Sequence, residues 1–183
     1  HMTVAREDAA PTSGPRCSAL ARELGEPVAA TAPVAQAWLV IEQPGAWGRQ
    51  ALLESRLPAG VGERLAARSE GSGTTVLLAR RPGRGADVRE ADSSRRFWLA
   101  HTAPGGVRMR SGVVEDVATL ADLDLRAVAR GELPPLGTRT AEPALFVCGN
   151  AKRDACCALA GRALAAALAA EPEVGEAVWE CSH

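Results

Sequence analysis

Tyrosine is absent from this sequence of 183 residues, and Lys152 is its only lysine. Arginine supplies the rest of the positive charge, which indicates the codon usage of a GC-rich genome rather than a function. Neither sign of charge is in excess, because 21 basic residues stand against 22 acidic ones and the net charge is −1. This balance argues against a nucleic-acid-binding protein and against a polybasic protein of the membrane surface, since both need a basic surplus.

Long apolar runs are absent as well. The longest apolar run with helical character, Ala163–Ala170, is far shorter than the roughly 20 residues that span a membrane. The segment Met2–Gly14 is polar and lacks the apolar stretch of a signal peptide. We therefore expect a cytoplasmic protein without a membrane partner. Apolar residues make up 46% of the chain and charged residues 23%, a globular composition that can bury a core.

Strand and helix patterns alternate along the chain after a polar arm at residues 1–16, which we expect to be flexible. Apolar periodicity predicts strands at 38–41, 74–79, 97–101, 107–113, 144–147 and 177–180. It predicts helices at 17–24, at 52–69 with an interruption at Pro58 and Gly60, at 116–132 and at 153–170. The stretch 134–143, rich in proline and threonine, is predicted to be a linker.

The order of these elements indicates an α/β fold. The order β-α-β-β-β-α of residues 37–133 is that of a thioredoxin-like domain, and the order β-α-β of residues 144–181 repeats its first half. We expect two thioredoxin-like units, an N-terminal one at 17–133 and an incomplete one at 144–183. A lone β-α-β unit buries little surface. We therefore expect a fragment, or completion of the second unit by packing on the first or on another chain.

Four of the five cysteines follow the predicted linker, and their positions point to a metal site. Cys148 directly follows a predicted strand, Cys157 lies in the first turn of the next helix, and His183 follows the next strand. In a parallel β-α-β unit these three positions lie at one edge of the sheet. A helix N-terminus stabilises thiolate, and thiolate with imidazole binds zinc or an iron–sulfur cluster.

The remaining cysteines have plainer interpretations. Free cysteine is often a buried apolar residue, so inert core thiols are the alternative to a metal site. This alternative is preferred for Cys17, for Cys156, which adjoins Cys157, and for Cys181, which lies inside a predicted strand. Cys181 is only two residues from His183 and is therefore kept as a reserve ligand.

Three motifs, taken in order, resemble the sucrase/ferredoxin-like family: WLVIEQPGAWG at 38–48, CGNAKRDACC at 148–157 and VWECSH at 178–183. Cys17-Ser18, with Glu26-Pro27 and Thr31-Ala32 downstream, is similar to the N-terminal signature of that family. The resemblance extends from about residue 17 to the end. Within the first motif, residues 43–48 are interpreted as a turn whose Trp47 packs in the core.

The resemblance implies a C-terminal thioredoxin-like ferredoxin domain with a [2Fe-2S] cluster held by two cysteines and two histidines. Cys148 and Cys157 match the cysteines of the family pattern C-x8-C, and His183 matches the first histidine. The second histidine would fall four positions beyond the last residue, so we expect a C-terminally truncated chain without the fourth ligand. Arg153 and Asp154 are expected either to support the ligands from behind or to form a salt bridge at the start of the helix.

The function that the resemblance implies is one-electron transfer, coupled to a proton through a ligand histidine, to a redox partner protein. We expect an electron carrier rather than an enzyme. Two alternatives stay open: a thiol-redox enzyme on a thioredoxin-like scaffold, disfavoured because no C-x-x-C is present, and a structural zinc module that uses the same residues. Sugar hydrolysis is discounted, because no carboxylate pair stands in the context of a glycosidase.

Overall fold

The computed structural model of the chain describes residues 17–27, 34–83, 94–152, 155 and 157–183. These residues fall into two compact units, 1–31 and 32–183. In the first unit, the helix predicted over 17–24 is present as α1 (Cys17–Glu23). The arm expected at 1–16 lies outside the described residues. All other helices and strands belong to the second unit.

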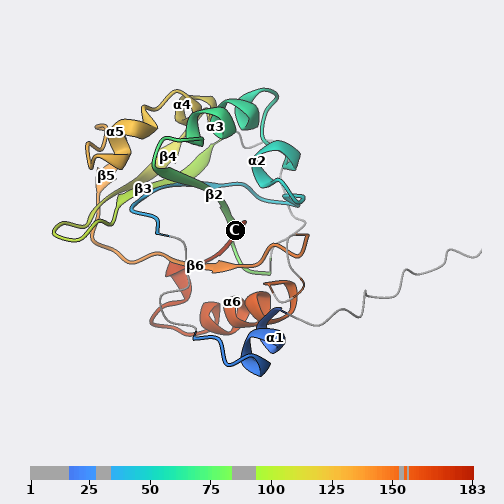
Figure 1. Cartoon of the computed structure of the whole chain (residues 1–183). Coiled ribbons are helices and arrows are strands. Elements are labelled where there is room, and N and C mark those ends of the chain that lie inside the picture. The colour runs from blue at the N-terminus through green and yellow to red at the C-terminus, as the bar shows by residue number, and fades with distance from the viewer. Residues whose placement is uncertain (1–16, 28–33, 84–93, 153–154, 156) are drawn as a thin grey trace, which may run out of the picture. The chain divides into compact units, whose positions relative to one another are not determined.

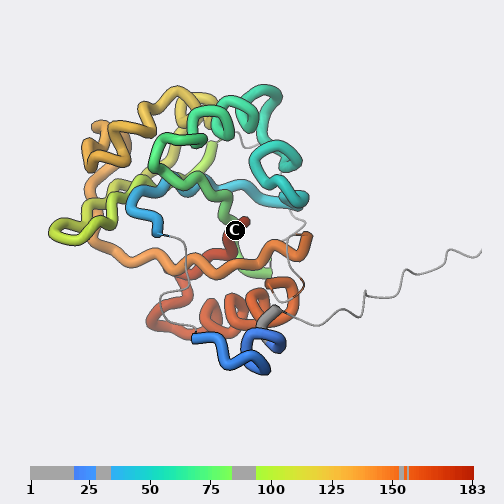
Figure 2. The backbone as a smooth tube through the Cα atoms, viewed as in Figure 1, coloured from blue at the N-terminus to red at the C-terminus, as the bar shows by residue number. Residues whose placement is uncertain are grey.

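The centre of the second unit is a mixed sheet (Figures 1 and 2). Within the described residues it has seven strands in the order β5-β4-β3-β1-β2-β7-β6. They are β1 (Ala37–Glu42), β2 (Thr74–Arg80), β3 (Arg95–His101), β4 (Arg108–Val114), β5 (Thr138–Arg139), β6 (Leu145–Cys148) and β7 (Val178–Cys181). The β1–β2 and β6–β7 pairs are parallel, and the other neighbours are antiparallel. The chain is therefore mixed α/β, and the parallel pair predicted in the second half is confirmed.

Helices cover one face of the sheet, because alternate strand residues are apolar and point to that side. Leu39 and Ile41 of β1 and Leu78 of β2 are completely buried there. Along β1–β4 lie α2 (Ala51–Glu54), α3 (Val61–Ser69), α4 (Ala118–Ala121) and α5 (Leu125–Ala129) (Figure 1). The turn η1 (Cys157–Gly161), α6 (Arg162–Ala169) and the turn η2 (Gly175–Ala177) connect β6 to β7. No helix in the described part of the chain is long and apolar enough to cross a membrane.

The other face of the sheet is concave, because the sheet is strongly twisted and coiled. Trp98 of β3 contacts Trp179 of β7 and Phe146 of β6 edge to face, with ring centroids 4.7 and 5.2 Å apart. By the strand order, β6 is the fourth neighbour from β3, and at about 4.8 Å per strand a flat sheet would keep these strands about 19 Å apart. The sheet must therefore twist and coil strongly, and its inner face encloses a second apolar cluster.

The strands β2 and β7 join the two parallel pairs along a short seam. The ladder between them has only two registered residue pairs, against six between β1 and β2. Hydrogen bonds beyond the end of β7 lengthen this seam. The Ser182 N–H donates to the Leu78 carbonyl at 2.9 Å, and the Leu78 N–H donates to Ser182 Oγ at 3.0 Å.

An ion pair between Arg80 and Glu180 is buried in this seam. Nε and Nη2 of Arg80 donate to one carboxylate oxygen of Glu180 at 2.9 and 2.7 Å, and the two side chains are 7% and 5% exposed. Nη1 of Arg80 donates to the Gly45 carbonyl at 2.6 Å, and the guanidinium lies 4.2 Å from the centre of a Trp47 ring. A buried charge needs a counter-charge and hydrogen bonds, so these contacts favour one alignment of β2 with β7.

Two local predictions differ from the structure. The single helix expected over 116–132 is two short helices, because the carboxylate of Asp124 caps α5 and accepts two N–H groups of its first turn at 3.0 and 3.1 Å. The linker expected over 134–143 contains β5, which pairs with β4. Arg110 of β4 fixes this segment, since its Nε donates to the Leu136 carbonyl at 2.8 Å.

Replacing one partner of the buried ion pair should destabilise the fold strongly. In Glu180→Gln the Arg80 cation stays buried without a counter-charge, and we expect the free energy of unfolding in urea to fall by about 3–5 kcal/mol. The matched control is Glu132→Gln, which removes a charge from the exposed pair with Arg130 and should leave the urea transition nearly unchanged.

The double variant Arg80→Met/Glu180→Leu should recover part of the stability lost in Glu180→Gln, because no buried charge remains. Equal effects of Glu180→Gln and Glu132→Gln in the urea titrations would contradict a buried charge pair at this seam.

Candidate functional site

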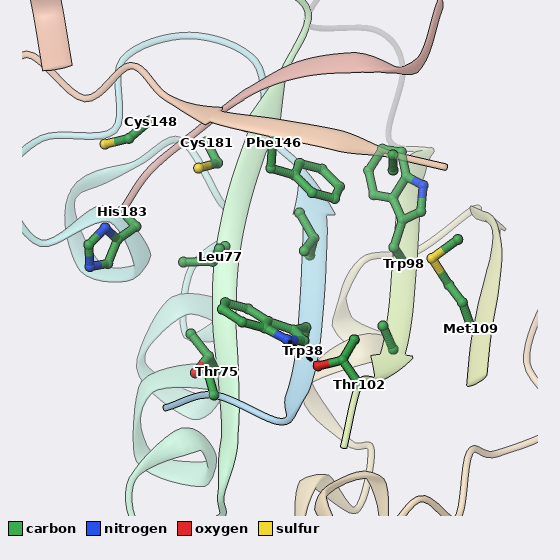
Figure 3. Close-up of a pocket in the computed structure, with 14 residues that line it drawn as sticks. Trp38, Thr75, Leu77, Trp98, Thr102, Met109, Phe146, Cys148, Cys181 and His183 are labelled. Atoms are coloured by element: carbon green, nitrogen blue, oxygen red, sulfur yellow. Dashed lines mark hydrogen bonds between the residues drawn. The ribbon is translucent and has the colours of Figure 1, made fainter. Parts of the chain in front are cut away.

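The predicted ligands Cys148 and His183 lie at the same edge of the sheet (Figure 3). Cys148 ends β6, Cys181 ends β7, and the parallel register makes these two cysteines direct partners, so their Cα atoms are about 4.8 Å apart. His183 follows two residues later and shares the strand face of Cys181, because side chains alternate along an extended chain. All three residues line one hollow of about 530 Å³ on the inner face of the sheet.

The rest of this hollow is apolar. Its walls come from the inner face of the curled sheet and consist of Ala35, Trp38, Val40, Thr75, Leu77, Trp98, Ala100, Thr102, Met109, Ala144 and Phe146. At the exposed rim of the hollow, Nε1 of Trp38 donates to Thr102 Oγ1 at 3.2 Å. The two thiols and the imidazole therefore stand at one end of a cavity whose other lining residues are aromatic and aliphatic, apart from Thr75 and Thr102.

Cys157 lies at the start of the helical segment, as the sequence predicted, and is half-buried. It is not among the residues that line the hollow. Gly161, one helical turn later, lies against the backbone carbonyl of Cys148, where a Cβ atom would have no room. This close approach places the helical segment that holds Cys157 and Gly161 against the end of β6.

The structure brings two of the three predicted ligands, Cys148 and His183, to one edge without joining the three into a finished site. Among the residues that it describes, no three His, Cys, Asp or Glu side chains are grouped so as to hold a metal ion. Arg153, Asp154 and Cys156 lie outside the described residues, so the roles expected for them stay predictions. Cys181, which was kept only as a reserve ligand, shares the hollow with Cys148.

Burial controls the chemistry of Cys181. Its removal from water raises the pKa of the thiol from 9.0 to about 11, the nearby Cys148 adds to this increase, and a hydrogen bond from the His183 backbone opposes it. The neutral thiol is therefore the stable form of Cys181 at physiological pH. A metal ion that recruits this residue has to displace the proton.

A buried polar network lies behind this edge, and the sequence analysis did not find it. Asn150, only 3% exposed, donates through Nδ2 to the carbonyls of Gly48 and Ser182 at 3.1 and 3.2 Å. Glu180 points to the same side, where Gly149 lies against its carboxylate. A charged residue inside the apolar strand pattern VWEC was the available signal, since a buried carboxylate requires a cationic partner.

The turn at residues 43–48 has the structural role that its sequence indicated. Trp47 is 2% exposed, belongs to the core under the helices, and donates from Nε1 to the Gln43 carbonyl at 2.7 Å. The same turn supplies the carbonyls of Gly45 to Arg80 and of Gly48 to Asn150. It therefore supports the cysteine-bearing edge from the neighbouring strand pair.

Comparison with known proteins adds no identification, since no family model, curated protein or solved structure matches this chain. The resemblance to the sucrase/ferredoxin-like family thus remains a prediction from the three motifs.

The raised pKa of Cys181 predicts slow alkylation. With a pKa of about 11, only about 0.1% of Cys181 is thiolate at pH 8, so iodoacetamide should modify it at least 100-fold more slowly in the folded protein than in urea. The unfolded chain releases this proton near pH 9 and the folded chain near pH 11, so the protein should lose stability as the pH rises between these values.

Pulsed alkylation at pH 7 to 11 with mass spectrometry of each cysteine peptide measures this pKa. Cys148, which is half-buried, serves as the internal comparison. Equal modification of Cys181 in the folded and the urea-treated protein at pH 8 would contradict a buried, protonated thiol.

Proposed function

We propose that this chain is an iron–sulfur electron-transfer protein of the sucrase/ferredoxin-like family. Cys148 and Cys157 would supply the thiolates for a [2Fe-2S] cluster, and His183 would supply an imidazole. The observation that supports the proposal is the common edge of two of these ligands: Cys148 and His183, separated by more than thirty positions, line one hollow at the ends of β6 and β7.

The donor atoms suit this cofactor in kind. Thiolate and imidazole bind both iron–sulfur clusters and zinc. In number the set has three members, and Cys181, which lines the same hollow as Cys148 and His183, is the reserve for a fourth. When bound, the cluster would accept and donate single electrons, and imidazole in place of thiolate would favour the reduced form, because the ligand set then carries less negative charge.

The chain's own residues would prepare this edge in three ways. The apolar walls of the hollow shield Cys181, which is 5% exposed, from water and leave Cys148 half-buried. A helix N-terminus close to Cys157, as the sequence predicts, would favour its thiolate. As a cluster ligand, His183 would couple electron transfer to a proton, as the family resemblance implies. A redox partner protein would supply or remove the electron.

Two thioredoxin-like units are part of this proposal, at residues 17–133 and 144–183. The strand order β4-β3-β1-β2, with a parallel β1–β2 pair joined through helices, supports the first unit. The second parallel pair, β6–β7, repeats the β-α-β half and pairs antiparallel with β2. Antiparallel pairing of β2 with β7 relates the two β-α-β halves by an approximate two-fold rotation, as an internal repeat would.

A thiol-redox or zinc-binding protein is the second candidate, and one observation favours it. Cys148 and Cys181 are register partners on neighbouring parallel strands and line the same hollow. Two thiols in this arrangement could be oxidised to a disulfide by a disulfide substrate, which would be reduced to two thiols. They could equally hold zinc together with His183.

Spectroscopy with chemical analysis tests the proposal. Anaerobically purified protein should show visible charge-transfer bands with equal iron and acid-labile sulfide, and a reduction potential above the about −400 mV of all-cysteine plant-type clusters. Cys148→Ala and Cys157→Ala should lose the bands, and His183→Ala should shift them. Cys17→Ser is the matched control and should keep the wild-type spectrum.

The contrary outcomes separate the candidates. Colourless protein that contains one equivalent of zinc, lost in Cys148→Ala, would replace the cluster with a zinc site. Metal-free protein with a reversible Cys148–Cys181 disulfide in peptide mapping would support thiol-redox chemistry instead.

A further inference from the structure

The side chain of Asn150 connects three segments that are far apart in the sequence. Its Nδ2 donates to the Gly48 carbonyl at 3.1 Å and to the Ser182 carbonyl at 3.2 Å. Its Oδ1 accepts the Lys152 N–H at 3.2 Å. All of this takes place in a side chain that is only 3% exposed. Donor and acceptor ends of the amide are both used, and together they tie the first-half turn, the cysteine loop and the end of β7 to one another.

We infer that Asn150 is a positioning residue, which holds the loop after Cys148 at a fixed distance from the chain end that carries His183. Asn150 follows Cys148 by two residues, and its bond to Ser182 lies one residue before His183. Its bond to Gly48 anchors both segments to the turn that follows β1, which belongs to the other parallel strand pair.

Hydrogen bonds of the Gly149 backbone already hold the loop after Cys148 to β7 and to α6, and the Asn150 side chain adds to them. The Gly149 N–H donates to the Cys181 carbonyl at 3.1 Å, which extends the β6–β7 ladder by one step. The Gly149 carbonyl accepts Nε of Arg162 at 3.0 Å, which ties the loop to α6. Beyond these bonds, the amide of Asn150 joins the continuations of β6 and β7 in the described residues.

The position requires a short side chain that donates two hydrogen bonds and accepts one, and the amide of asparagine does both. Aspartate has the same shape and could still accept the Lys152 N–H, but it would direct a carboxylate oxygen at two carbonyl oxygens. Alanine would leave two buried carbonyls without their donor. Asn150→Asp therefore removes the two donated bonds and adds a buried charge while keeping the shape of the side chain, and Asn150→Ala removes the whole side chain without adding a charge.

The consequence for a metal centre follows from the narrow tolerance of metal–ligand distances. Residues that orient ligands from behind typically contribute 10- to 100-fold to metal affinity. This consequence rests on the proposed function, whereas the positioning of the two segments does not. The test therefore has one readout without metal and one with it.

Hydrogen exchange of the metal-free, full-length chain is the first readout. We expect exchange of residues 148–152 and 180–183 to become at least 10-fold faster in Asn150→Asp and Asn150→Ala, while the amides of β1 keep their protection. Thr74→Val is the matched control: it removes a buried hydrogen bond to the Leu125 carbonyl, 2.6 Å long, at the far end of β2, and should leave both segments unchanged.

Titration with Co²⁺, followed through its thiolate charge-transfer absorption, is the second readout. Both Asn150 variants should bind Co²⁺ 10- to 100-fold more weakly than the wild type, and Thr74→Val should bind it with wild-type affinity. If the wild type itself binds no Co²⁺, the metal proposal fails, and the exchange experiment still decides the role of Asn150.

Two results would overturn the inference. One is wild-type exchange at 148–152 and 180–183 in both Asn150 variants. The other is a uniform rise in exchange that includes β1, or loss of folding in both variants, because Asn150 would then support the whole fold rather than fix two segments.

Discussion

The buried ion pair between Arg80 and Glu180 is the interaction on which the arrangement of this protein depends. Within the described residues, the strand ladder between the two parallel pairs is the short β2–β7 seam, and this ion pair lies at one end of it. Arg80 also contacts the turn after β1, because it donates to the Gly45 carbonyl and stacks on Trp47. The seam has few backbone hydrogen bonds. The need to pair Arg80 with Glu180 therefore fixes the register of β2 against β7.

Local sequence patterns were sufficient for most of the secondary structure. The strand at 74–79 was predicted from a run of β-branched and aliphatic residues, and the structure extends it by one residue. The interruption of the helix at 52–69 followed from Pro58 and Gly60, which cannot continue a helix at low energy. The split between α4 and α5 was missed, because it depends on the cap that Asp124 provides rather than on periodicity.

Long-range pairing could not be predicted in the same way. That Cys148 and His183 share an edge followed from the parallel β-α-β rule, but the register that makes Cys148 and Cys181 neighbours depends on how β6 and β7 align. The seam between β2 and β7 joins residues a hundred positions apart. Asn150 was overlooked for the same reason, since its three partners come together only in the folded chain.

The segment that contains β6 and β7 cannot easily be separated from the rest of the chain, because the two members of the buried ion pair lie on opposite sides of the cut. A cut in the segment before β6 would leave the guanidinium of Arg80 in one piece and the carboxylate of Glu180 in the other. Each piece would then carry a charged side chain without its counter-charge. Each would also expose a strand edge that is hydrogen-bonded in the intact chain. A recombination event that exchanged the C-terminal segment would survive only where the incoming strand brought an acid to the same register. The two halves are therefore constrained to evolve as one unit, although their strand order reads as a repeat.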